Sequence, residues 1–132
     1  MAYIVVADDD PISLQIHQQI LEHLGHDVAA CNHGAEAYAV FQQEPHRWQL
    51  LVTDIAMPQM DGVTVCQALR NELHIQVPVI AITSYERHLF NAELVEAFDA
   101  WLVKPVVRSV LSAAIDCVLW GKHMYLPGAQ KR

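Results

Sequence analysis

Basic residues are scarce in this sequence, above all in its first third. No Lys or Arg precedes Arg47, Lys104 is the only lysine before Lys122, and the formal net charge is −7. Nucleic-acid binding depends on clustered Lys and Arg side chains that contact phosphates. The lack of such clusters predicts that this chain does not bind nucleic acid directly.

Paired cysteines and long apolar runs are also missing. Cys31, Cys66 and Cys117 are odd in number, widely spaced and without a C-x-x-C pair, which favours reduced thiols over a disulfide framework or a zinc site. No apolar stretch approaches the roughly 20 residues of a membrane span, and no basic and then apolar segment marks a signal peptide at the N-terminus. We therefore expect a cytoplasmic protein that does not enter a membrane.

What the sequence does contain is an alternation of short apolar runs and amphipathic stretches, within the 132 residues of one ordinary domain. Short, β-branched runs predict buried strands, and apolar residues at helical spacing (Ile12, Ile16 and Ile20, for example) predict helices. Strands are expected over 3–7, 27–31, 50–54, 77–83 and 100–103, and helices over 11–24, 35–43, 63–73, 86–98 and 106–120. A strand–helix unit repeated five times predicts an α/β fold, with a parallel sheet covered by helices on both faces.

Polar side chains stand where the expected strands end. The first strand ends on Asp8 and Asp9, the third on Asp54, the fourth on Thr83 and the fifth on Lys104. In open α/β sheets, ligands bind outside the carboxyl ends of the parallel strands. These five side chains are therefore expected to converge on one rim of the sheet.

Three converging carboxylates need compensation. At about 5 Å and an effective dielectric near 20, each pair repels by roughly 3 kcal/mol. Lys104 offsets part of this repulsion, and a hard divalent cation with oxygen ligands would offset the rest. Mg²⁺ suits the set best, because it takes few protein carboxylates and completes its coordination with water and phosphate oxygens. We expect the aspartates to hold Mg²⁺ and the metal to hold a phosphate.

The same residues carry a family resemblance. From Tyr3 to Trp120 the chain resembles the receiver domain of two-component response regulators, on motifs that stand in the family's order: the Asp8-Asp9 pair, the aspartate of "VTDIAMPQMDG", Thr83 in "AIT" and Lys104-Pro105 in "WLVKP". The "TDIAMPQMDG" stretch is most similar to receivers of hybrid sensor kinases. The resemblance implies a doubly wound, flavodoxin-like (βα)5 sheet of order 2-1-3-4-5, with a receiver over 1–121 and a tail over 122–132.

The resemblance also implies a role for each site residue. Asp54 would accept a phosphoryl group from a phosphohistidine, while Lys104 would pair with a phosphoryl oxygen. Asp9 and Asp54 would bind Mg²⁺ directly and Asp8 through water, and the Ala56 backbone carbonyl would be a further ligand.

The resemblance also assigns two residues to the conformational change that follows phosphorylation. Thr83 would hydrogen-bond the phosphoryl group, and Trp101 stands where the family keeps a Tyr or Phe that swings inward with that threonine. The Lys104–Pro105 bond would be cis. The implied partners are a sensor histidine kinase or a histidine phosphotransfer protein, and a downstream effector. Such a domain is a phosphoacceptor with self-catalysed phosphotransfer and not a conventional enzyme.

Simpler roles suit several other residues. Asp10 before Pro11, and Asp61 before Gly62, are interpreted as helix caps or turn residues. His17, His23 and His26 are interpreted as solvent-facing, and Leu119 and Trp120 as core packing.

Three other function classes are weighed against the phosphoacceptor. A flavodoxin-like cofactor binder would need a phosphate cradle after the first strand, whereas "DDDP" would repel a phosphate without a metal. A pseudo-receiver that binds proteins without phosphorylation would have lost an acid or Lys104. A hydrolase with Asp54 as nucleophile would need a cap domain or a substrate pocket. The chain could also be the receiver piece of a longer regulator or hybrid kinase.

Overall fold

The computed structural model describes residues 1–57, 60–85 and 90–121. Strands and helices alternate along these residues, as the sequence predicts. The elements are β1 (Tyr3–Ala7), α1 (Pro11–His23), β2 (Asp27–Cys31), α2 (Gly34–Gln43), β3 (Leu50–Thr53), α3 (Gly62–Asn71), β4 (Val79–Thr83), α4 (Ala92–Glu96), β5 (Ala100–Val103) and α5 (Arg108–Trp120).

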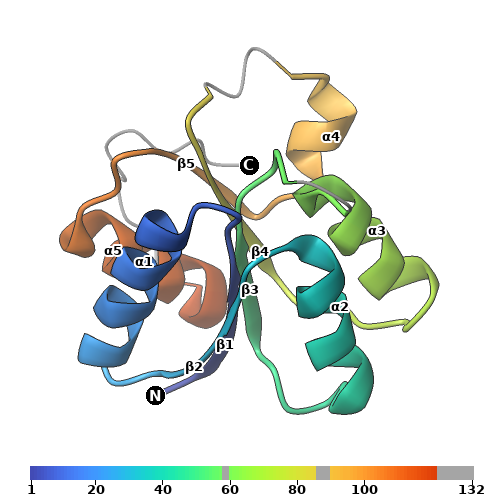
Figure 1. The fold of residues 1–132 in the computed structure, drawn as a ribbon, viewed down its shortest axis with the longest axis horizontal. Coiled ribbons are helices and arrows are strands. Elements are labelled where there is room, and N and C mark those ends of the chain that lie inside the picture. Colours follow the sequence, from blue (N-terminus) through green and yellow to red (C-terminus); the bar gives the residue numbers. More distant parts are fainter. Residues whose placement is uncertain (58–59, 86–89, 122–132) are drawn as a thin grey trace.

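The strands form one parallel sheet in the order β2-β1-β3-β4-β5. This order confirms the doubly wound fold, with β2 and β5 at the edges. Helices α1 and α5 cover one face, and α2, α3 and α4 cover the other (Figure 1). Because successive side chains of a strand point to opposite faces, Val5 and Leu51 belong to one buried cluster, and Ile4 and Leu50 to the other.

Several boundaries differ from the sequence-based expectation. The fourth strand begins at Val79 and not at Val77, because Pro78 has no N–H to extend the ladder. The last helix begins at Arg108 and not at Val106, because its N-cap Val107 is extended. The helix expected over 86–98 is described only as α4, and residues 86–89 lie outside the described part of the chain.

The end of α5 corrects one interpretation. Leu119 packs partly against the core, as expected, but the Trp120 side chain is 54% exposed and does not belong to it.

The tail predicted over 122–132 lies outside the described residues, so its boundary stays a prediction. Within the described ranges, no helix has the length and apolar character to cross a membrane.

Candidate functional site

Three aspartates meet at the carboxyl ends of β1 and β3. One carboxylate oxygen from each of Asp8, Asp9 and Asp54 can be chosen so that all three lie within 4.8 Å of one another. Asp8 and Asp54 are only 2% and 9% exposed, whereas Asp9 is exposed to solvent. The strand pairing explains the meeting, because Ala7 of β1 is in register with Thr53 of β3 and each aspartate follows directly.

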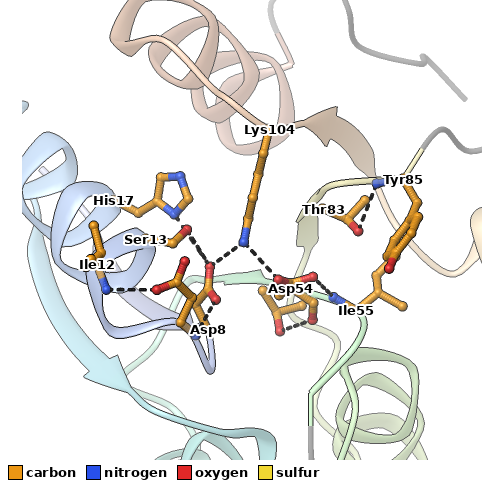
Figure 2. A network of polar contacts seen from close by, with 11 residues as sticks. Asp8, Ile12, Ser13, His17, Asp54, Ile55, Thr83, Tyr85 and Lys104 are labelled. Carbon is orange, nitrogen blue, oxygen red and sulfur yellow. Dashed lines mark hydrogen bonds and ion pairs between the residues drawn. The ribbon is translucent and has the colours of Figure 1, made fainter.

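Lys104 joins two of these carboxylates. Its Nζ donates to Asp8 Oδ2 and to Asp54 Oδ2, at 2.9 Å each (Figure 2). Burial disfavours the charged ammonium, but the hydrogen bonds and charges of Asp8 and Asp54 outweigh that cost and raise the pKa of Lys104 above its ordinary value. The lysine is therefore a fixed positive charge between two acids. The Lys104–Pro105 peptide bond is cis, as the resemblance implies.

The buried carboxylates are oriented by further donors. Asp54 Oδ1 accepts a hydrogen bond of 2.7 Å from the Ile55 backbone N–H. Asp8 Oδ1 accepts from the Asp10 N–H at 2.9 Å, and Asp8 Oδ2 accepts from Ser13 Oγ at 2.8 Å. Sequence reasoning did not single out Ser13. The available signal was a hydroxyl on the first turn of a helix that starts next to an acidic pair.

Gly62 lets α3 begin against the backbone of Asp54. A Cβ at Gly62 would lie 2.3 Å from the Asp54 carbonyl oxygen, closer than any side chain could approach. The Gly62 N–H also donates to the Ile55 carbonyl at 2.9 Å. The glycine therefore fixes the loop that carries Ala56, whose side chain is exposed. This requirement, too, was absent from the sequence-based interpretation of the "MDG" motif.

Thr83 and Trp101 lie toward the β4–β5 side of the rim. The Thr83 side chain is fully buried, and its Oγ1 accepts from the Tyr85 N–H at 3.4 Å (Figure 2). Trp101 is 2% exposed and donates from Nε1 to the Tyr85 carbonyl at 3.0 Å. The segment around Tyr85 is therefore bonded to both residues that the resemblance assigns to the response.

Two other aspartates are helix caps, as the sequence predicts. Asp10 accepts from the Ile12 N–H at the start of α1, and Asp61 accepts from the Thr64 N–H at the start of α3. Each side chain satisfies a backbone donor that its helix leaves free. Neither belongs to the acidic cluster.

His17 contradicts the expectation of a solvent-facing residue. It is 5% exposed, on the inner face of α1 with Leu14 and Leu21, and its Nδ1 lies 4.0 Å from Asp8 Oδ2. Ile12 and Ile16 are 70% and 48% exposed instead. Burial lowers the pKa of His17 below 6.5, and the Lys104 charge adds to this lowering, while the Asp8 and Asp54 carboxylates oppose it.

The lowered pKa of His17 predicts a loss of stability in acid. Well above pH 6.5 the imidazole is neutral in both states. As the pH falls through about 6.5, the unfolded chain takes up the proton more readily than the folded protein, so the free energy of unfolding falls. In His17→Leu, we expect this fall between roughly pH 7 and pH 5 to be smaller. Urea unfolding at several pH values measures it, with the exposed His23→Leu as control. An unchanged pH dependence in His17→Leu would contradict the expectation.

The donor set suits a hard cation. Carboxylate oxygens are the ligands that Mg²⁺ prefers, and only one cation, Lys104, is described among the three acids. The exposed Asp9 lies on the solvent side of the cluster, where a hydrated ion can enter. The same arrangement is unsuited to holding a cofactor phosphate without a metal, because the turn after β1 presents carboxylates.

The chain is similar to known proteins of one family. A family model described as "Response regulator receiver domain" matches residues 4–116. The chain is 35% identical over 117 residues to the "Probable transcriptional regulator ycf27" of Pyropia yezoensis, which covers 88% of this chain and 46% of that protein. It is 30% identical over 118 residues to "Hybrid signal transduction histidine kinase L" of Dictyostelium discoideum, which covers 85% of this chain and 7% of the kinase.

A solved structure gives the same result for the fold. The response regulator receiver domain protein from Clostridium thermocellum matches with a TM-score of 0.79 at 28% identity, over 92% of this chain and 96% of that one. The chain spans about half the length of the curated regulators that it matches.

Proposed function

The chain belongs to the response regulator receiver domain family, and from this premise we propose that Asp54 accepts a phosphoryl group from a partner's phosphohistidine. An Asp54 carboxylate oxygen attacks the phosphorus, the phosphorus–nitrogen bond breaks, and the leaving imidazole takes up a proton. The observation that carries the proposal is the setting of Asp54, which is buried, oriented by the Ile55 N–H, and paired with Lys104 beside two further acids.

Mg²⁺ is the cofactor of this proposal. Asp9 and Asp54 would hold it directly, Asp8 through a bound water, and the Ala56 backbone carbonyl would complete the protein's share of the ligands. The ion would neutralise charge on the phosphoryl oxygens. Lys104 supplies a second, permanent positive charge, since it donates to Asp54 Oδ2 while the Ile55 N–H donates to Asp54 Oδ1. Burial of Asp54 limits the access of bulk water to its carboxylate.

The phosphoryl group would change the protein through Thr83 and Trp101. Phosphorylation turns one negative charge into roughly two and adds strong acceptor oxygens. The Thr83 hydroxyl accepts a hydrogen bond from the Tyr85 N–H, and its own proton is free to turn toward such an oxygen. Because Trp101 also holds the Tyr85 carbonyl, movement of Thr83 would shift this segment and present a different surface to an effector protein.

The partners follow from the same chemistry. The phosphoryl donor would be a histidine kinase or a histidine phosphotransfer protein. The partner that binds the phosphorylated form would be an effector domain or protein. Likeness to a transcriptional regulator and to a hybrid kinase is compatible with either a separate or a fused arrangement. A pseudo-receiver is less well supported, since all three acids and Lys104 are present and in contact range.

Incubation with a small acyl phosphate and Mg²⁺, followed by intact-mass measurement, tests this function. The expected result is a gain in mass of one phosphoryl unit. No such gain is expected when a chelator removes the metal before the donor is added. A small acyl phosphate carries a reactive phosphoryl group of its own, so the partner need not be known. No gain in mass at saturating donor and Mg²⁺ would overturn the proposal.

Asp9 and Asp10 are expected to contribute very differently to Mg²⁺ binding. Asp9→Asn removes a charge and a ligand atom from the cluster, so Mg²⁺ affinity should fall by at least about tenfold. Asp10→Asn affects only the cap of α1 and should cost about 1 kcal/mol of stability or less. Calorimetric titration with Mg²⁺ measures both. Equal losses of affinity would show that Asp9 has no special role.

A further inference from the structure

Asp8 accepts hydrogen bonds from more groups than a purely metal-binding carboxylate requires. Oδ1 accepts from the Asp10 N–H at 2.9 Å, and Oδ2 accepts from both Ser13 Oγ at 2.8 Å and Lys104 Nζ at 2.9 Å. A carboxylate oxygen offers about two lone-pair sites. Oδ2 is therefore saturated by protein donors, whereas Oδ1 keeps one site free.

The Ser13 hydroxyl is the donor without an evident structural need. It lies on the first turn of α1, half-buried, and points at Asp8 (Figure 2). It also borders a cavity of about 310 Å³ whose lining includes Ile16, His17 and Lys104. A larger apolar side chain would fill this space, so a small hydroxyl that donates to Asp8 calls for an explanation at the site.

We propose that Ser13 is a positioning residue that holds Asp8 against Lys104. The inference rests on the proposed function, because it concerns the same phosphoryl transfer. With Oδ2 occupied by Ser13 and Lys104, only Oδ1 of Asp8 keeps a lone pair for the metal site. Ser13 would thus act as an outer-shell partner, which orients a group of the metal site without binding the ion itself.

Holding Asp8 in place also holds Lys104. Lys104 Nζ bonds to both Asp8 and Asp54, but Asp54 is the group that is modified, so its oxygen changes during transfer. Asp8 is the anchor that stays the same before and after. A hydroxyl that fixes this anchor therefore keeps the ammonium beside Asp54 while the phosphoryl group arrives.

The first experiment reads the resting protein and needs no phosphorylation. An amine-acylating reagent modifies only the neutral, accessible lysine amine. In Ser13→Ala, Lys104 should be acylated at least about three times faster than in the parent, because the ammonium loses part of its anchorage. Peptide mass spectrometry assigns the label, and Lys122 and Lys131, the other two lysines of the sequence, report the reagent dose.

The second experiment reads the reaction. In Ser13→Ala, phosphorylation at saturating Mg²⁺ should slow by about tenfold, while the Mg²⁺ dissociation constant should change less than about twofold. Ser13→Thr keeps the hydroxyl, and the cavity has room for its methyl group, so both readouts should return to near parent values. Ser109→Ala, an exposed serine in the first turn of α5, is the matched control.

The outcomes distinguish failure of the positioning role of Ser13 from failure of the proposed phosphoacceptor function. Faster acylation of Lys104 and slower phosphorylation in Ser13→Ala, both restored by Ser13→Thr, support the positioning role. Parent-like values in Ser13→Ala overturn it, as does equal damage in Ser13→Thr, which would indicate a helix defect. If the parent takes up no phosphoryl group, the proposed function fails, and the acylation experiment alone decides whether Ser13 positions Lys104.

Discussion

Asp54→Asn is expected to abolish phosphoryl incorporation. The amide of asparagine has nearly the shape of the carboxylate but lacks its charge and is a far weaker nucleophile towards phosphorus. Loss of the nucleophile should lower the rate by more than about 1,000-fold, which places labelling below detection by intact mass. The Ile55 N–H can still donate to the Asn side-chain oxygen, so folding is expected to be retained.

Asp61→Asn is the matched control for this substitution. Asp61 caps α3 and is exposed, and asparagine is an equally good N-cap residue. Its rate of phosphorylation should remain within about twofold of the parent, since a retained cap leaves the Asp54 loop in place. If Asp54→Asn gains one phosphoryl unit at the parent's rate, another residue is the acceptor.

Lys104→Met is expected to separate metal binding from phosphoryl transfer. Methionine keeps the length of the side chain but removes the ammonium that donates to both Asp8 and Asp54. Loss of a charge placed for the transition state typically costs about 100- to 1,000-fold in rate. Because the acidic cluster becomes more negative, Mg²⁺ should bind at least as tightly as in the parent.

The two quantities are measured on the same protein preparation. Phosphorylation rates come from intact mass against time at saturating Mg²⁺, and affinities come from calorimetry. Arg108→Met removes an exposed cation at the start of α5 and should change neither quantity appreciably. A parent-like rate in Lys104→Met would mean that this lysine stabilises the resting site and does not assist the transfer.

The stability of Lys104→Met needs a separate check, because the substitution leaves two carboxylates without their shared partner. Breaking a partly buried ion pair by removing one member is destabilising. Urea unfolding with and without Mg²⁺ shows the size of this effect. A stabilising effect of Mg²⁺ that is larger than in the parent would follow from the same excess of negative charge.

Much of the architecture could be read from the sequence because its signals are local. β-branched runs such as 3–7 and 79–83 can be satisfied only as buried strands, and Pro11 and Gly25 bracket the first helix. The element boundaries were less predictable. Whether Val106 and Val107 begin a helix depends on the turn after β5, which the apolar pattern does not encode.

The inner face of α1 shows where pattern alone failed. Ile12, Ile16 and Ile20 have helical spacing, and so have Leu14, His17 and Leu21. Hydropathy favours the first set, but the second is buried and Ile12 and Ile16 are exposed. The rotation of the helix places Leu14 and Leu21 in the buried cluster with Ile4 and Leu50, on one face of the sheet. Packing against the sheet thus decided which of the two sets is buried.

By itself, the sequence placed Asp8, Asp9, Asp54, Thr83 and Lys104 at the ends of strands, and parallel strands bring their carboxyl ends to one edge whatever the details of packing. Only the tertiary structure decided how they meet. The pairing of one ammonium with two carboxylates, and the recruitment of Ser13 and His17 beside Asp8, depend on the rotation of α1 and the path of the chain after β5. The helix rotation and the chain path are set by packing between segments that are far apart in the sequence. A single stretch of sequence contains only one of the two surfaces in each such contact.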